Sequence, residues 1–399
     1  MDVRGSWEVE KSLMRIAFDI SVTGRTRTGV GVYARALQQA LTDRALEVRP
    51  WQLPLGDDGS RGRRLRNGVR LANWFARGIR SRAQRERIDV VHTTTSVGPL
   101  ACGCPVVMTV HDATPLTMPV NRGLGDRAFT RLFSVEAARR AAAIIAPTRH
   151  AADAIAEHYR IPRSRIHVTP LGVAPHFRTP ATEAVTAVKR RLGLDRPYVL
   201  FVGAGTRRKN LPRLVAAVGL VARTLPDVVL VIAGPVGRND ESIVTAIPRG
   251  VALPDVRRLG EVDDADLPAI YAGAACLGYV SEYEGFGLPI VEAMSAGTPV
   301  VTSNTSSMPE VAGDAALLVD PWSVESIADG LQRVLCDSTL SEILRLRGLA
   351  RSLQFDWART ATATEQVYRE ACGLDYSSRV ALSPGPDSAP AHSPAALAQ

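Results

Sequence analysis

Two carboxylates flank a glycine-rich turn in residues 281–292, which read Ser-Glu-Tyr-Glu-Gly-Phe-Gly-Leu-Pro-Ile-Val-Glu. Glu284 stands just before the turn, and Glu292 falls about one turn inside the helix that the Leu-Pro step begins. Gly285 and Gly287 leave backbone amides open to close approach. Because a carboxylate accepts hydrogen bonds from paired hydroxyls, the stretch predicts a site for an elongated polyhydroxy ligand. The alternative is that both carboxylates stabilise a helix N-terminus, which explains one glutamate but not the glycines.

A second polar stretch, Ala-Gly-Thr-Arg-Arg-Lys-Asn at residues 204–210, lies between a predicted strand and an amphipathic helix. We expect Asn210 to cap that helix. A helix N-terminus carries partial positive charge, so neighbouring cations are unfavourable there unless an anion binds. The stretch therefore predicts a phosphate site, with a solvated basic loop as the alternative. The cations are Arg207, Arg208 and Lys209.

Two weaker signals lie in the first half of the chain. Gly29 and Gly31 follow the first predicted strand, but their spacing does not fit the dinucleotide-binding pattern Gly-x-Gly-x-x-Gly. His111 stands beside Asp112 at the end of another predicted strand. It is either a structural histidine or a residue that contacts substrate, and its place at a strand end favours the second role.

The elements that must position these residues alternate between short apolar runs and helices, which predicts parallel α/β structure. The alternation of apolar runs and helices stops at residues 172–197, which are predicted to be a linker, and it resumes after them. We therefore expect two Rossmann-like parallel-sheet domains that face each other across a cleft, with ligands beyond the carboxyl ends of the strands. The predicted strands are residues 15–20, 46–51, 89–92, 106–110, 142–146, 166–169, 198–203, 228–233, 256–259, 275–280, 299–303 and 316–319. The predicted helices include residues 32–41, 126–140, 150–158 and 356–371.

The division of the chain follows from these patterns and from composition. The Ser/Pro/Ala-rich end cannot bury a core and is predicted to be disordered. The predicted segments are a disordered extension at 1–13, an N-terminal domain at 14–178, a C-terminal domain at 179–355, a closing helix at 356–375 and a disordered tail at 376–399.

Of the 399 residues, 46% are hydrophobic, yet no apolar run is long enough to span a membrane and the N-terminus lacks a signal-type apolar core. We therefore predict a cytoplasmic protein. The five cysteines include no second pair at zinc spacing, so we expect reduced thiols and no metal site.

The net charge of +8 is concentrated in residues 61–87, which hold ten arginines and one acid, Glu86. An apolar face in this stretch suits an interfacial helix on an anionic membrane, and it equally suits a helix packed on the first domain with solvated arginines. Nucleic acid is a poorer partner because no recognition motif accompanies the charge. The apolar face consists of Leu71, Trp74, Phe75 and Ile79.

These motifs resemble those of a known family over nearly the whole chain. The stretch from Glu284 to Glu292 resembles the Glu-x7-Glu motif of the family-4 glycosyltransferases, also called glycosyl transferases group 1. These are retaining enzymes of the GT-B fold. Arg208-Lys209-Asn210 is similar to the family's diphosphate-binding loop, in the form found in mannosyl- and rhamnosyltransferase-like members. Residues 309–321 resemble its C-terminal domain, and residues 28–33 and 111–112 resemble its N-terminal half.

The resemblance implies that the C-terminal domain holds a nucleotide-diphosphate sugar, without a metal or other cofactor. Glu292 would bind the ribose hydroxyls, and Lys209 with Arg208 would bind the diphosphate and stabilise the leaving group. Glu284 would hold the donor sugar together with backbone amides. Those amides belong to Phe286, Gly287 and Leu288.

The N-terminal domain would take the acceptor. Gly29 and Gly31 would let its first loop approach the phosphates, and His111 would contact the donor sugar near the reacting carbon. One departure is Ala204, where many members of the family have arginine. Arg207 or Arg208 would then take the role of that family arginine.

The predicted function is transfer of a hexose or deoxyhexose, with mannose favoured, to a hydroxyl acceptor in polysaccharide or glycoconjugate biosynthesis. A lipid-linked acceptor would place the enzyme peripherally on the inner membrane face. The alternatives are another sugar-nucleotide enzyme on the same fold, such as an epimerase or a sugar-phosphate synthase, and a non-catalytic regulatory subunit. An NAD-dependent dehydrogenase is poorly supported because the fingerprint spacing is missing.

Overall fold

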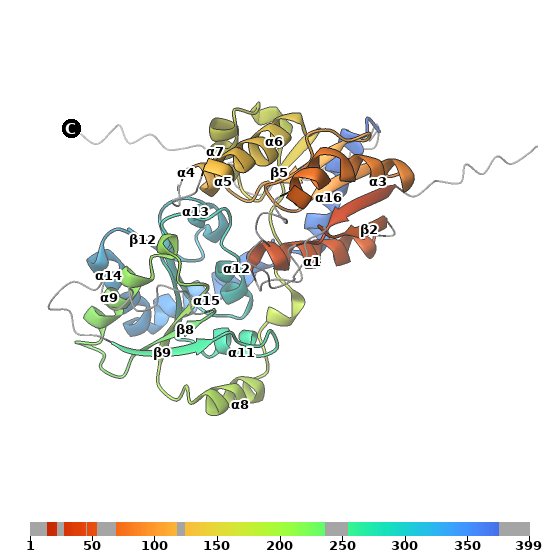
Figure 1. Cartoon of the computed structure of the whole chain (residues 1–399). Coiled ribbons are helices and arrows are strands. Elements are labelled where there is room, and N and C mark those ends of the chain that lie inside the picture. The colour runs from red at the N-terminus through yellow and green to blue at the C-terminus, as the bar shows by residue number, and fades with distance from the viewer. Residues whose placement is uncertain are drawn as a thin grey trace, which may run out of the picture.

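The chain folds into two α/β lobes, each built on a six-stranded parallel sheet (Figure 1). The computed structural model describes residues 14–21, 28–44, 46–53, 69–117, 124–235 and 254–374. The predictions for residues 1–13 and 376–399 lie outside these ranges. The prediction of two parallel-sheet units is confirmed.

The first sheet is formed by strands that read as short apolar runs because they are buried on both faces. β3, β4 and β5 are buried at every position. Its strands are β1 (Arg15–Asp19), β2 (Glu47–Trp51), β3 (Val90–Thr93), β4 (Val106–Thr109), β5 (Ala143–Ala146) and β6 (Ile166–Val168), in the order β2-β1-β3-β4-β5-β6. Its helices include α1 (Gly29–Thr42), α3 (Ile79–Arg85), α4 (Thr114–Thr117), α5 (Leu124–Thr130), α6 (Ala137–Arg140) and α7 (Arg149–Tyr159).

The second sheet has its first strand in the middle, so its order reverses between β7 and β10. Its strands are β7 (Tyr198–Val202), β8 (Val229–Ala233), β9 (Asp255–Gly260), β10 (Cys276–Tyr279), β11 (Val300–Ser303) and β12 (Leu317–Val319), in the order β12-β11-β10-β7-β8-β9. Its helices include α8 (Thr182–Leu192), α9 (Leu211–Val221), α11 (Leu267–Ala272), α12 (Leu288–Ser295), α13 (Met308–Ala312), α14 (Val324–Cys336) and α15 (Ser338–Ser352).

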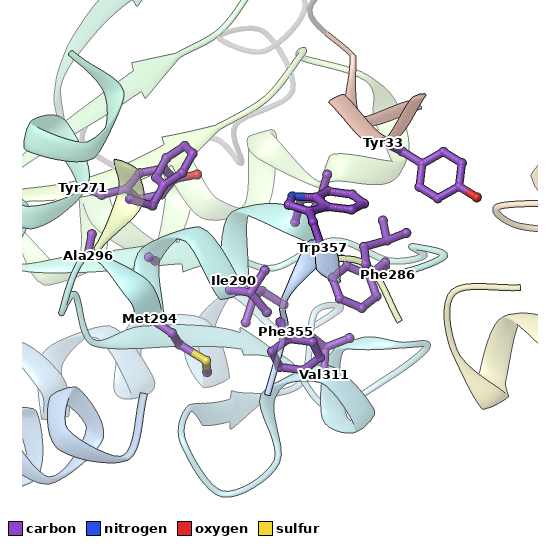
Figure 2. Packing of buried hydrophobic residues seen from close by; sticks show 14 of the residues in the cluster. Tyr33, Tyr271, Phe286, Ile290, Met294, Ala296, Val311, Phe355 and Trp357 are labelled. Carbon is purple, nitrogen blue, oxygen red and sulfur yellow. The ribbon is translucent and has the colours of Figure 1, made fainter. Parts of the chain in front are cut away.

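The last helix, α16 (Trp357–Ala371), returns to the first lobe and contacts α1, β4 and β5 (Figure 1). The aromatic residues at its start lie between the lobes (Figure 2). Phe355 meets Phe286 edge-on with ring centroids 5.6 Å apart, and Trp357 lies 6.1 Å from Tyr33. One buried hydrophobic cluster therefore joins residues of both lobes and supports the turn that carries Phe286.

Two of the predicted elements differ from the structure. The predicted linker contains α8, whose only buried residue is Val188, so its apolar stripe is too thin to be recognised in the sequence. The helix predicted at 126–140 is interrupted by a π-helical turn, η2 (Arg131–Glu136). Among the described residues no helix is long and apolar enough to cross a membrane.

The described part of the basic stretch follows the second of its two alternatives. Residues 69–85 are helical and include the π-helical turn η1 (Trp74–Gly78). Phe75 and Ile79 are buried in the core of the first lobe, and Leu71 and Trp74 pack against that core. The apolar face is thus unavailable to lipid, whereas the arginines at 70, 77, 80 and 85 are exposed.

Candidate active site

Two loops meet at the reversal of strand order in the second lobe, where parallel sheets commonly bind ligands. The loop after β7 contains the 3-10 turn η5 (Arg207–Lys209), and the loop after β10 leads into α12. Asn210 does not cap α9 with its side chain as predicted. Its backbone is left-handed (φ 57°), and its Nδ2 donates to the carbonyl oxygens of Val280 (3.0 Å) and Pro321 (2.6 Å). Asn210 therefore ties the two loops together.

Glu284 is the centre of a buried ion cluster. Its carboxylate lies 2.5 Å from Arg208 Nη1 and 2.9 Å from Lys209 Nζ. It also accepts hydrogen bonds from Tyr279 (2.9 Å) and Ser281 (3.1 Å). Burial alone would raise the pKa of Glu284, but the charges of Lys209 and Arg208 outweigh it and bring the pKa to about 2. The structure thus brings together the three charged residues that were predicted separately from the sequence.

Glu292 is also buried and lies in the second turn of α12. Tyr271 donates a hydrogen bond to its Oε2 (2.7 Å). Burial raises the pKa of Glu292 to about 7, although the Tyr271 hydroxyl and the charge of Lys209 act in the opposite direction. The carboxyl is therefore poised between its two protonation states near neutral pH.

The glycines of the turn are required by space and by backbone conformation. A Cβ on Gly285 would lie 1.9 Å from the carbonyl oxygen of His111 in the other lobe. Gly287 has φ of 106° and is the N-cap residue of α12, and no side chain caps that helix. Neither glutamate therefore caps α12 with its side chain. The amides of residues 286–288 lie at this helix start.

A serine-rich loop after β11, which the sequence analysis did not single out, holds the Glu284 loop by its backbone. Ser306 Oγ donates to the carbonyl oxygen of Glu284 (2.8 Å) and accepts from the Glu284 N–H (3.1 Å). The Ser306 backbone is left-handed (φ 58°), which is uncommon for a non-glycine residue. The neighbouring bonds run from Ser303 Oγ to the carbonyl oxygen of Ser281 (2.6 Å) and from Ser307 Oγ to that of Phe286 (2.9 Å).

The first lobe brings His111 against this turn. His111 Nε2 lies 3.0 Å from the carbonyl oxygen of Thr94, so Nε2 carries the proton, and the ring meets Tyr33 edge-on at 4.8 Å. Burial lowers the pKa of His111, which keeps the imidazole neutral. Gly29 approaches Leu288, since a Cβ there would lie 3.6 Å from Leu288 Cδ1.

Gly31 takes part in the capping of α1. Its N–H donates to the hydroxyl of Thr28 (3.3 Å), which is the N-cap of α1. The preceding loop residues, 22–27, lie outside the described ranges.

Two hydrogen-bonded contacts close the lobes over the site. Thr148 Oγ1 donates to the carbonyl oxygen of Gly285 (2.9 Å). The carboxylate of Glu310 accepts from the N–H groups of Arg149 (2.8 Å) and His150 (3.1 Å), at the start of α7. The Glu284 turn thus lies at the seam between the lobes. Among the described residues no group of three metal-ligating side chains comes together.

Two parallel-sheet lobes, with the Arg208–Lys209–Glu284 cluster at the strand reversal of the second, form the GT-B fold. Residues 27–177 match Glycosyltransferase Family 4, and residues 185–349 match Glycosyl transferases group 1. The chain belongs to this family of glycosyltransferases, so the family resemblance noted in the sequence is confirmed.

Similar proteins agree with this placement. The O-antigen chain mannosyltransferase B of Escherichia coli is 38% identical over 214 residues, which are 53% of this chain and 56% of that protein. The chain therefore spans little more than half of that relative. A D-inositol 3-phosphate glycosyltransferase of Paenarthrobacter aurescens is 26% identical over 86% of this chain and 93% of that protein. The structure of a sucrose-phosphate synthase from Thermosynechococcus elongatus superimposes with a TM-score of 0.72 at 22% identity, covering 91% of this chain and 100% of the other.

Proposed function

We propose that this protein is a retaining, metal-independent hexosyltransferase that moves mannose from GDP-mannose to a hydroxyl group of a glycan acceptor. The observation that carries the proposal is the pairing of Arg208 and Lys209 with the buried Glu284 at the strand reversal of a family-4 glycosyltransferase. Mannose is favoured by the likeness to mannosyltransferase B and by the Arg-Lys-Asn form of the loop.

When the donor binds, its diphosphate takes the place of the Glu284 carboxylate beside Arg208 and Lys209. The donor diphosphate replaces Glu284 as the counter-ion of Arg208 and Lys209, whose side chains are 29% and 13% exposed. The released Glu284 carboxylate then accepts hydrogen bonds from hydroxyls of the donor sugar, beside the amides of residues 286–288. Glu292 accepts hydrogen bonds from the ribose hydroxyls. Because the cations are held in place before the reaction, little reorganisation is needed as charge develops.

Bond cleavage places negative charge on the departing diphosphate, and Lys209 with Arg208 stabilises that charge. Two fixed cations thereby supply what a divalent metal supplies in many other phosphate-transfer sites. The acceptor hydroxyl attacks the anomeric carbon from the face that the leaving group vacates and passes its proton to the departing phosphate oxygen, so the anomeric configuration is retained. Neutral His111 contacts the sugar near the reacting carbon, and the Gly29 loop closes over the phosphates.

The acceptor is proposed to be a lipid-linked glycan at the cytoplasmic face of a membrane. Because the apolar face of the basic stretch is buried, any membrane contact there is electrostatic and comes from the exposed arginines at 70, 77, 80 and 85. Flotation with anionic vesicles should show binding at low salt that disappears at about 0.5 M salt. Absence of binding at low salt would remove the membrane from the proposal.

The function is tested by incubating the protein with GDP-[14C]mannose and three acceptors: an α-mannoside, a lipid-linked mannoside and an inositol phosphate. We expect label on a mannoside and, by NMR, an α-linkage like that of the donor. Label on the inositol phosphate, or transfer only from another nucleotide sugar, would contradict the mannose and glycan assignments. Conversion of the donor without an acceptor would favour an epimerase. Nucleotide binding without any turnover would favour a regulatory subunit.

A further inference from the structure

A pair of cysteines lies outside the glycosyltransferase site, in the loop between β3 and β4. Cys102 and Cys104 flank Gly103, and their Sγ atoms are 3.5 Å apart. Both side chains are partly exposed. The two sulfur atoms of a disulfide are about 2.05 Å apart. Rotation of the two side chains that moves the sulfur atoms closer by under ~2 Å would therefore bring them to bonding distance. Gly103 between them is exposed and leaves the short ring backbone freedom.

The two thiols differ in their protonation. The hydrogen bond from the Cys104 thiol lowers the pKa of Cys102 to about 6, with help from nearby backbone N–H groups and the charge of Arg80. The same contact, together with burial and the nearby Cys372 and Asp89, raises the pKa of Cys104. A thiolate thus stands beside a protonated thiol, which is the arrangement of an attacking and a resolving cysteine.

We propose that Cys102 and Cys104 form a redox-active dithiol that reacts with small-molecule disulfides of the glutathione type. The Cys102 thiolate attacks one sulfur of the small disulfide, which forms a mixed disulfide and releases one thiolate. Cys104 then gives up its proton and attacks Cys102 Sγ, which forms the Cys102–Cys104 disulfide and releases the second thiol. Two electrons pass from the protein dithiol to the small disulfide, which is reduced to two thiols.

The other cysteines serve as internal references. Cys276 is fully buried, and burial raises its pKa to about 12. Cys336 is a free, exposed thiol at the end of α14. A metal site is the poorer interpretation of the pair, because no third ligand joins it in the described parts of the chain.

The dithiol also lies away from the transferase chemistry. It precedes β4, whereas His111 follows β4, so the two are at opposite ends of the same strand. Replacing Cys104 should therefore leave basal sugar transfer unchanged. The dithiol and the proposed function can accordingly be tested independently.

The test is differential alkylation of the full-length protein after equilibration in buffers of increasing oxidised-to-reduced glutathione ratio, followed by peptide mass spectrometry. We expect the peptide with Cys102 and Cys104 to lose about two mass units and both alkylation sites together, while Cys336 gains a glutathione adduct. In Cys104→Ser, Cys102 should instead retain the adduct. Stable glutathione on Cys102 of the wild type, or free thiols at both positions in the most oxidising buffer, would overturn the proposal.

Discussion

Replacing Glu292 by glutamine is expected to stabilise the folded protein at alkaline pH while weakening its hold on the donor. Glu292 is buried, and its pKa is raised from 4.5 to about 7. In the unfolded chain the carboxyl ionises at its ordinary pKa, so folding is opposed once the pH exceeds that value. Glutamine cannot ionise, yet it keeps an oxygen that can accept the Tyr271 hydrogen bond (2.7 Å).

The size of the effect follows from linkage between protonation and folding. The difference between 4.5 and about 7 corresponds to about 3 kcal/mol of lost stability above pH 7. The contribution is fully present below pH 4.5 and is lost as pH rises towards 7. Between pH 5 and pH 8, Glu292→Gln should therefore gain about 2.5 kcal/mol relative to the wild type.

The assay is urea unfolding at both pH values, because the comparison of wild type and variant cancels the titration of every other group. Glu157, exposed on α7, supplies the matched control Glu157→Gln. A stability difference between Glu292→Gln and wild type that stays the same at pH 5 and pH 8 would refute the reasoning. So would a pH-dependent difference of equal size in the control.

Three further substitutions test the site and the seam between the lobes. Lys209→Met removes a charge-assisted contact with the diphosphate, worth about 1.5–3 kcal/mol, so steady-state kcat/KM for the donor should fall by roughly 10- to 150-fold. Ser306→Gly accepts the left-handed backbone without strain but loses both bonds to the Glu284 backbone. Its melting temperature should fall, because the two lost bonds outweigh the relief of backbone strain, and kcat/KM should fall by roughly fivefold or more. Glu310→Gln removes the negative charge from the start of α7 and weakens the closed arrangement by about 1 kcal/mol, which small-angle scattering should detect as a larger radius of gyration.

Each of these expectations has a contrary result. Unchanged kinetics in Lys209→Met would remove that lysine from the diphosphate site. A Ser306→Gly protein that retains full activity would show that the serine only shapes a loop, and Ser306→Asn, which tolerates the same backbone, controls for side-chain loss. An unchanged scattering profile in Glu310→Gln would show that the lobes are held together by their hydrophobic contacts alone.

Much of the fold could be predicted because each buried parallel strand is a short apolar run in the sequence. Strands such as β7 and β8 were found within a residue of their observed bounds, since every residue of β8 is buried. α8 was missed because one buried residue leaves almost no pattern. The basic stretch could not be decided from sequence, because an apolar helix face has the same composition whether it meets a lipid or the neighbouring core.

The candidate site was predictable where strand ends concentrate polar residues. Lys209 and Glu284 are far apart in sequence, yet both follow strands that are neighbours at the reversal of order, and this brings them to 2.9 Å. Ser306 and Glu310 could not be found this way. Their contacts depend on a left-handed loop and on the placement of one lobe against the other, and neither leaves a local pattern.

Calorimetric titration of the purified protein with GDP, UDP, dTDP, ADP and NAD⁺ in parallel tests the nucleotide-sugar site most directly. The arrangement of Arg208 and Lys209 predicts saturable binding of a nucleoside diphosphate at one site, with NAD⁺ without effect. The proposed GDP-mannose donor predicts that GDP binds the tightest. Binding of NAD⁺ alone, or of no nucleotide at all, would contradict the assignment of these residues to the donor site.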